Sequence, residues 1–171
     1  MRAVVVYESM YGNTHTIAEA LGDGLSWVFD TSVVAADCAT TDLISKAELV
    51  AVGAPTHAHS LPRAATRKAA IDAAREKAMA LDASAQRAGV REWFIDVGAH
   101  PHAIALAFDT RLAMPASITG RAGRGIARRL RRCSFADVRD AGSFFVDKNN
   151  VLLAGETERA AAWGRAFVRD L

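Results

Sequence analysis

The first 25 residues constrain the fold most, because an apolar strand pattern passes into a helical pattern through a short polar loop. Val4 to Tyr7 is a short and almost entirely apolar run, which is typical of a parallel strand buried on both faces. From Ile17 onward the apolar residues recur at helical spacing, with Leu21 and Leu25 on the same face as Ile17. A strand that leads into a helix in this way is the repeating unit of α/β proteins.

The loop between this strand and this helix could bind an anion. Its sequence is Ser9-Met10-Tyr11-Gly12-Asn13-Thr14. A helix that begins here leaves free backbone N–H groups and the positive end of its dipole facing outward, and both favour phosphate. Ser, Asn and Thr are also ordinary helix caps, and Thr16 to Glu19 fits a capping box. On its own the loop is equally consistent with a phosphate-binding loop and with a plain turn.

The rest of the chain repeats the alternation of strands and helices. Apolar, β-branched runs predict strands at Ala3–Tyr7, Thr31–Ala36, Ala47–Gly53, Ala103–Phe108 and Gly142–Val146, with a short piece at Ala136–Arg139 as an optional addition. Helical patterns cover Asn13–Val28, Arg63–Gln86 with a break considered near Leu81, Gly89–Val97, Gly120–Cys133 and Gly155–Arg169. Five strands alternating with helices indicate an α/β fold with a parallel sheet covered on both faces. At 171 residues, we expect a single domain over residues 1–171.

Composition narrows the class of protein. No apolar run approaches the roughly 20 residues that span a bilayer, and the N-terminus lacks the layout of a signal peptide. The two cysteines, Cys38 and Cys133, are too few for a disulfide framework and match no metal spacing. We therefore expect a soluble, cytoplasmic protein with reduced cysteines and no membrane partner.

Parallel sheets bind ligands beyond the carboxyl ends of their strands, so the residues after each strand are the candidate site. These are Ser9 to Thr14, the stretch Pro55-Thr56-His57-Ala58 and the stretch Asp109-Thr110-Arg111. A P-loop would need a lysine that the first loop lacks, and a dinucleotide fingerprint would need three glycines where only Gly12 is present. A phospho-receiver would need an aspartate after the third strand, where this chain has Gly53-Ala54-Pro55.

The remaining pattern resembles the flavodoxin family. Ser9 to Thr14 is similar to that family's FMN-phosphate loop, Thr/Ser-x-Thr-Gly-x-Thr, with Tyr11 in place of the middle hydroxyl residue. Gly53 to His57 is similar to the Gly-x-Pro-Thr stretch that edges the isoalloxazine. Phe108 to Arg111 and Trp163-Gly164 resemble a group of actinobacterial flavodoxin-domain proteins. The resemblance implies a three-layer sandwich whose five-stranded parallel sheet has the order 2-1-3-4-5.

The resemblance also implies the cofactor and the site. The cofactor would be FMN, and its phosphate would be bound by backbone N–H groups and hydroxyls, because the loop contains no basic side chain. The implied binding residues are Ser9, Met10, Tyr11, Gly12, Asn13, Thr14, Pro55, Thr56, His57, Ala58, Asp109, Thr110 and Arg111. No catalytic residue is assigned, and no metal is expected.

The implied function is FMN-dependent electron transfer, with two forms left open. The chain could be a flavodoxin-type carrier or a small NAD(P)H- or quinone-linked reductase, and the Ser-Met-Tyr-Gly-Asn loop looks more like the FMN-dependent quinone reductases of this fold. The partner would be a redox protein, or a small quinone or nicotinamide. Because the ring-side loops contain no Trp or Tyr, the alternative is a binding or regulatory module that has lost its flavin. Whether the chain is an enzyme, and its oligomeric state, stay open.

Two charged candidates accompany the flavin hypothesis. His57 is either a flavin contact or proton donor near neutral pH, or an exposed loop histidine. Arg111 could supply positive charge near the pyrimidine end of the flavin. The pairs His57/His59 and His100/His102 fall at opposite ends of a parallel sheet, so their imidazoles would not converge on a metal.

Six arginines gather between Arg121 and Arg132, although the net charge is only +2. They could be a solvated helix face, a surface for an acidic protein partner, or a source of weak nucleic-acid attraction. No aromatic residues interleave them, so we expect no specific nucleic-acid partner.

Overall fold

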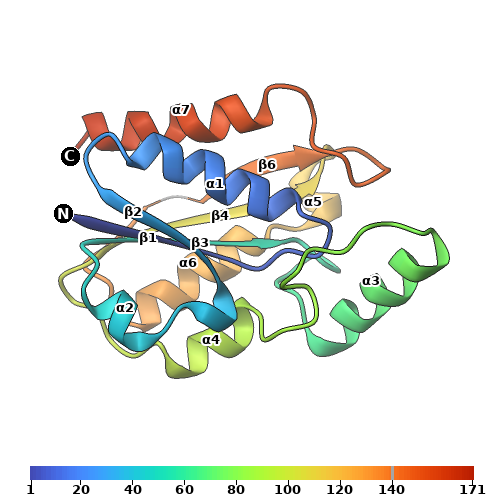
Figure 1. Ribbon diagram of the computed structural model, residues 1–171, viewed down its shortest axis with the longest axis horizontal. Helices are drawn as coiled ribbons and strands as arrows, with labels where there is room; N and C mark the ends of the chain where they lie inside the picture. The colour runs from blue at the N-terminus through green and yellow to red at the C-terminus, as the bar shows by residue number, and fades with distance from the viewer. Residues whose placement is uncertain (140) are drawn as a thin grey trace.

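The protein, described here over residues 1–139 and 141–171 of a computed structural model, is built on a parallel β-sheet (Figure 1). The strands are β1 (Arg2–Tyr7), β2 (Asp30–Ala35), β3 (Leu49–Pro55), β4 (Ile104–Leu112), β5 (Asp137–Val138) and β6 (Gly142–Val146). Their order is β2-β1-β3-β4-β5, and β6 also pairs with β4. The short β5 and the longer β6 together occupy the fifth position, because they pair with successive parts of β4. The order confirms the predicted 2-1-3-4-5 arrangement.

Helices cover both faces of the sheet. They are α1 (Asn13–Leu25), α2 (Thr41–Ser45), α3 (Ala64–Glu76), α4 (Val90–Asp96), α5 (Ala116–Thr119), α6 (Ala122–Arg132) and α7 (Glu156–Arg169). Figure 1 shows α1 and α7 on one face, α2, α4 and α6 on the other, and α3 beside the end to which the strand arrows point. No helix within the described residues is both long enough and apolar enough to cross a membrane.

Two apolar cores hold the helices on the sheet. On the face of α1 and α7, Ile17 and Leu21 pack in one buried cluster with Phe108. On the opposite face, Ile126 and Leu130 of α6 pack in a second cluster with strand residues. The central strands β1, β3 and β4 are buried almost throughout, as the continuous apolar runs in their sequences predict.

Strand β4 is longer than the sequence suggests, and this corrects the predicted loop at Asp109 to Arg111. The strand continues to Leu112 because its distal half pairs with β6, from Phe108 opposite Gly142 to Leu112 opposite Val146. Asp109, Thr110 and Arg111 are therefore strand residues with alternating side-chain directions. They cannot all face one ligand.

Helix α3 is shorter than the sequence suggests, and the predicted helix to Gln86 is wrong beyond Glu76. Its alanine-rich sequence buries only Ala74, so little packing energy extends the helix. Ala78 has a positive φ of 50°, which an α-helix does not accommodate. The following loop instead docks on the loop between β1 and α1, where the N–H of Asp82 donates to the carbonyl of Met10 over 2.9 Å.

Candidate functional site

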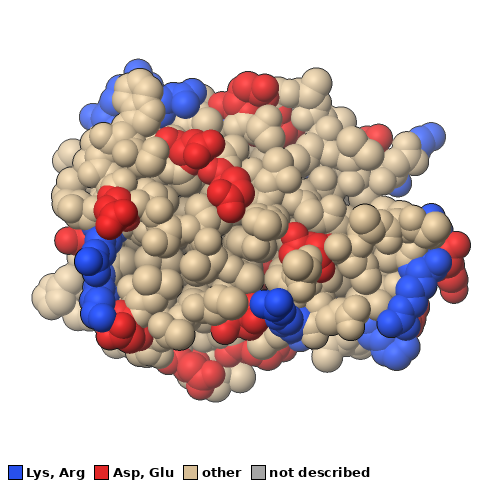
Figure 2. Space-filling view, viewed as in Figure 1, with Lys and Arg blue, Asp and Glu red and all other residues tan. Residues whose placement is uncertain are grey.

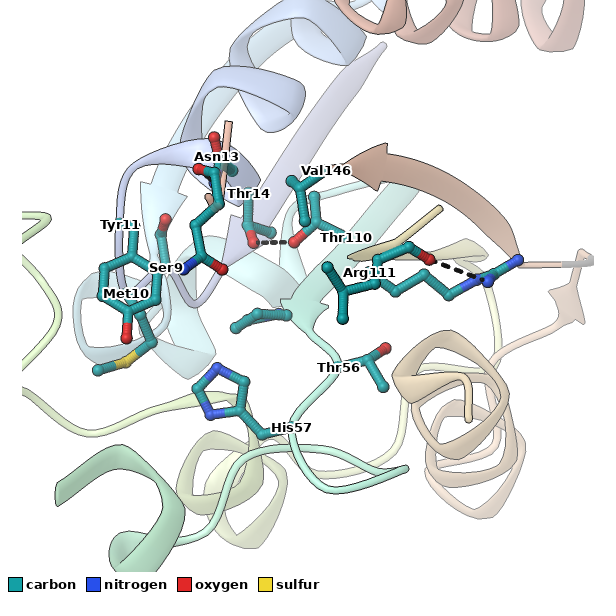
Figure 3. Close-up of a pocket in the computed structure, with 13 residues that line it drawn as sticks. Ser9, Met10, Tyr11, Asn13, Thr14, Thr56, His57, Thr110, Arg111 and Val146 are labelled. Atoms are coloured by element: carbon teal, nitrogen blue, oxygen red, sulfur yellow. Dashed lines mark hydrogen bonds between the residues drawn. The ribbon is translucent and has the colours of Figure 1, made fainter. Parts of the chain in front are cut away.

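A pocket of about 150 Å³ opens at the carboxyl ends of β1, β3, β4 and β6 (Figure 3). In the space-filling view the molecule is indented at the same edge, between α3 and the loop after β6 (Figure 2). The pocket is lined by Ser9, Met10, Tyr11, Asn13, Thr14, Pro55, Thr56, His57, Thr110, Arg111, Leu112, Val146 and Asn150. Most of the residues predicted from the strand ends therefore meet in one place.

The loop from Ser9 to Thr14 exposes backbone donors to this pocket. The first three N–H groups of α1 belong to Asn13, Thr14 and His15, and none has an acceptor among the described residues. The helix has no side-chain cap, because its N-cap residue is Gly12 in the left-handed conformation with φ 86°. Only glycine adopts this φ without strain. The loop thus has the free donors and the dipole end of an anion site.

Hydrogen bonds hold this loop in shape. The N–H of Gly12 donates to the hydroxyl of Ser9 over 3.1 Å, so these two groups satisfy each other. The hydroxyl of Thr14 lies 2.8 Å from the hydroxyl of Thr110 on β4 (Figure 3). The side-chain amide of Asn13 donates to the carbonyl of Asn150 over 2.7 Å. The donors are therefore preorganised by contacts with β4 and with the loop after β6.

Tyr11 stands where the family loop usually has a hydroxyl residue. Its phenol donates to the carbonyl of Ala70 on α3 over 3.0 Å, so it connects the loop to that helix. Its pKa is raised by burial, which keeps the phenol neutral. The substitution leaves the backbone donors of the loop available.

The residues present fit the phosphate of FMN. The described residues that line the pocket include no Asp and no Glu, so nothing repels an anion there. A Cβ built on Gly12 would meet no atom within 4 Å, so the space in front of the turn is open. Backbone N–H groups that bond to a charged oxygen contribute about 1.5–3 kcal/mol each. A dianion needs no basic side chain in such a cradle.

Thr56 and Asp109 act together at the beginning of α6. The hydroxyl of Thr56 accepts the N–H of Ala122 over 2.9 Å, and a carboxylate oxygen of Asp109 accepts the N–H of Gly123 over 2.7 Å. Asp109 also accepts the hydroxyl of Ser143 over 2.7 Å and is completely buried. Its pKa is raised by burial.

These contacts place the carboxylate of Asp109 against the beginning of α6. The side chain lies beneath the pocket and does not line it, because β4 continues through this position and turns the carboxylate toward α6. Asp109 thus connects β4 to the start of α6 and to Ser143 of β6. Thr56 caps the same helix and still lines the pocket.

His57 begins a tight turn at the edge of the pocket. Its N–H and carbonyl exchange hydrogen bonds with Ser60, and Ala58 and His59 have positive φ angles of 44° and 67°, as a type I′ turn requires. Figure 3 shows the imidazole directed into the pocket. Burial, followed by the charge of Arg67, lowers the pKa of His57, so the neutral imidazole is favoured. Ala58, at the exposed tip of the turn, does not line the pocket.

Arg111 lines the pocket with its stem, and its guanidinium is directed away from the centre (Figure 3). The guanidinium donates to the carbonyl of Met114 over 2.6 Å and lies 4.7 Å from the ring centroid of Phe145. Its pKa is lowered by burial. The predicted placement of this charge near a flavin pyrimidine is therefore not the arrangement in this structure, because the segment after β4 captures the side chain.

Sequence reasoning missed a buried ionic cluster next to the loop. Glu8 is 5% exposed and follows β1 directly; it accepts the N–H of Val90 over 2.9 Å. Arg67 of α3 lies 3.4 Å from Glu8 and 2.8 Å from Glu92 of α4. The pKa of Glu8 is raised, above all by burial. A charged residue at the end of an otherwise apolar strand was the one sequence signal for this cluster.

Aliphatic side chains surround the part of the pocket away from the loop Ser9 to Thr14, where the flavin ring is expected to lie. Leu112 and Val146 line it, while Met114, Ile118 and Val151 in the adjoining segments are exposed. Among the described lining residues, Tyr11 and His57 supply the aromatic rings. This surface is apolar and open, and it lacks a pair of large rings that would enclose a planar ligand.

The loop geometry, the pocket at the carboxyl edge and the strand order agree with one family. The flavodoxin family model matches residues 5–90, which include the loop after β1 and the turn after β3. This chain belongs to the flavodoxin family. The cofactor of the family is FMN, and its members transfer electrons to redox partner proteins.

Solved structures show the same fold over the whole chain. A flavodoxin from the domain Archaea is 20% identical with a TM-score of 0.66, over 99% of this chain and 98% of that one. Flavodoxin 2 from Bacillus cereus is 13% identical with a TM-score of 0.67, and the match covers 100% of both chains. A WrbA-like flavodoxin from Agrobacterium tumefaciens is 16% identical with a TM-score of 0.56, over 99% of this chain and 96% of that one. A search of curated protein sequences gives no match.

Proposed function

We propose that this protein is an electron carrier that binds FMN with its phosphate on the loop Ser9 to Thr14. The observation that carries the proposal is the set of unpaired N–H groups at Asn13, Thr14 and His15, at the start of α1 and beside a pocket without carboxylates. FMN, when bound, accepts and releases one or two electrons. The protein would hold it at an edge of the sheet that a partner can reach.

The other pocket residues would serve the flavin ring. The neutral imidazole of His57 is directed into the pocket, and Thr56 and Pro55 form the edge beside it. Leu112 and Val146 would provide apolar contact on the opposite side. The match of the whole chain to flavodoxins of similar length supports a carrier.

The comparison of FMN with riboflavin tests the phosphate site. Riboflavin lacks only the phosphate, so the ratio of the two dissociation constants isolates the contribution of the loop. Two charge-assisted hydrogen bonds predict that FMN binds about 10²–10⁴-fold more tightly than riboflavin. Quenching of flavin fluorescence during titration measures both constants. Equal affinities would contradict the phosphate site. If the fluorescence of neither flavin changed during the titration, the protein would be a flavodoxin fold that no longer binds flavin.

A second candidate function is a small quinone- or nicotinamide-linked reductase. The open, aliphatic ring side favours it, because a planar substrate could stack on an uncovered flavin face. Steady-state oxidation of NADH and NADPH with a water-soluble quinone separates the two functions. Turnover clearly above that of free FMN would establish the reductase, whereas turnover equal to free FMN would favour the carrier.

A further inference from the structure

Helix α6 presents arginines along one side, and they form what we call the basic groove. The groove has a volume of about 340 Å³ and is lined by Arg121, Arg124, Ala127, Arg128, Arg131 and Ala141. The arginines recur every three or four residues, so they share one face of the helix. Ile126 and Leu130 face the core instead and are completely buried. The arrangement is thus an amphipathic helix whose outer side carries a single sign of charge.

Among the described residues, no salt bridge joins an arginine of the basic groove to a carboxylate. Within residues 1–139 and 141–171, Arg124 and Arg128 are exposed and form no salt bridge. Arg121 and Arg131 donate to neutral acceptors, the hydroxyl of Ser143 and the carbonyl of Val138. The sequence from position 113 to position 136 contains no Asp and no Glu. A concentrated positive potential therefore remains on this side of the molecule.

Other arginines, among them Arg128 of the basic groove, surround the neighbouring Arg129. Burial lowers the pKa of Arg129, and the charges of Arg91, Arg132 and Arg128 lower it further. By contrast, the face in Figure 2 shows acidic and basic side chains interspersed. The clustering on α6 is a local property, because the whole chain has a net charge of only +2.

The basic groove begins beside the pocket. The N–H of Ala122, in the first turn of α6, donates to Thr56, which lines the pocket. The exposed Met114 and Ile118 lie in the segment that leads from the pocket into α6. A partner that contacts the arginines would therefore be held close to the pocket. An apolar centre with charged groups at its margin is the usual composition of a protein interface.

The spacing of the arginines indicates which anion they suit. Arg124, Arg128 and Arg131 lie on successive turns of one helix, so their Cα atoms extend over about 10 Å along its axis. Carboxylates spread over a protein surface match such a spacing, and each guanidinium can bind one bidentately. The described groove residues include no aromatic side chain, which disfavours a nucleic-acid strand.

We propose that the basic groove of α6 is the docking surface for an acidic redox partner protein, which it holds next to the pocket. This inference rests on the proposed electron-transfer function. The arginines would steer the encounter and orient the complex, as complementary charges do at other interfaces.

Two matched double variants test the docking surface. Arg124→Glu with Arg128→Glu reverses the groove, whereas Lys77→Glu with Arg169→Glu reverses two exposed charges elsewhere, at the end of α3 and on α7. Each double variant lowers the net charge by four from +2, so only the position of the charge differs. The probe is a strongly acidic [2Fe–2S] ferredoxin, titrated into the isotope-labelled protein at low and at moderate salt. NMR line shifts give the affinity and the residues contacted.

The expected result is salt-sensitive binding that perturbs the resonances of α6, with at least about a tenfold loss of affinity in the groove variant. The control variant should stay within about threefold of the wild type. Equal losses in both variants, or no binding by the wild type at low salt, would overturn the proposal. Titration of each variant with FMN separates this outcome from failure of the flavin site, because the groove variant should bind FMN as the wild type does.

Discussion

The buried carboxylate of Asp109 provides the sharpest prediction about how the pocket wall is held. Alanine at this position would leave the N–H of Gly123 and the hydroxyl of Ser143 without the acceptor that each has at 2.7 Å. Hydrogen bonds to a charged group contribute about 1.5–3 kcal/mol each, and the relief of a buried charge offsets part of this loss. We expect Asp109→Ala to lower the free energy of unfolding by about 2–4 kcal/mol.

Asp109→Asn is the matched variant, because it removes the charge and keeps both contacts. Its amide oxygen can accept from Gly123 while its NH₂ group donates to the oxygen of Ser143. Burial raises the pKa of Asp109, so ionisation is harder in the folded protein than in the unfolded chain. The stability that depends on Asp109 therefore falls as the pH rises from the unfolded pKa of about 4 through the folded pKa. The asparagine variant lacks this dependence.

Urea unfolding followed by circular dichroism measures these differences at about pH 5 and about pH 8. The wild type should lose stability relative to Asp109→Asn between the lower and the higher pH. An alanine variant within about 0.5 kcal/mol of the wild type would refute the structural role. A wild type that gains stability over Asp109→Asn as the pH rises would refute the effect of burial.

Three further predictions concern other buried contacts. Arg67→Met should cost about 3 kcal/mol of stability in urea unfolding, because it leaves Glu8 buried beside no cation; a loss below about 0.5 kcal/mol would contradict this. Burial, the largest cause, raises the pKa of Tyr7 to about 12, so its stabilising effect is present below about pH 10 and is lost through pH 12. Because burial also raises the pKa of Tyr11, alkaline ultraviolet titration should show both phenols ionising above their usual range, Tyr7 at about pH 12, and ionisation of both at about pH 10 would count against it. Gly53→Ala should destabilise by about 1–3 kcal/mol because a Cβ would collide with the ring of Phe108, and an unchanged melting temperature would show that the ring can move.

The fold was predictable because its main signals are local. The apolar run before Tyr7 and the helical spacing from Ile17 identify one strand–helix unit, and the same alternation recurs along the chain. The end of β4 was not predictable in this way. The three residues that follow Phe108 are polar, and they are held in the sheet by β6, which lies more than 30 positions away in the sequence. Long-range pairing of this kind leaves no periodic signal in one segment.

The segments that form the candidate site were predictable from the sequence, but the contacts that each side chain makes there were not. Ser9 to Thr14 met the other strand ends because parallel strands bring their carboxyl ends to one edge. The direction of the Arg111 side chain depends on its hydrogen bond to the carbonyl of Met114. The carboxylate of Asp109 accepts a hydrogen bond from the first turn of α6, so its contacts depend on where that helix begins. Neither contact follows from the spacing of residues, since each is decided by the tertiary packing of a distant segment.

The central claim is that the loop Ser9 to Thr14 binds the phosphate of FMN, and a pair of glycine variants tests it most directly. Gly12 and Gly98 both have positive φ, of 86° and 74°, and both have open space where a Cβ would stand. Gly98 lies after α4 and before β4, at the amino end of the sheet. Aspartate at either position therefore adds the same charge and similar backbone strain, and only at Gly12 would it lie in the loop.

A carboxylate about 5 Å from a phosphate costs about 3 kcal/mol per pair of charges at an effective dielectric constant of about 20. Flavin fluorescence titration should thus show Gly12→Asp binding FMN at least about 100-fold more weakly than the wild type. Gly98→Asp should stay within about threefold of the wild type, and the affinity for riboflavin should change little in either variant. Tight binding of FMN by a folded Gly12→Asp protein would contradict the account.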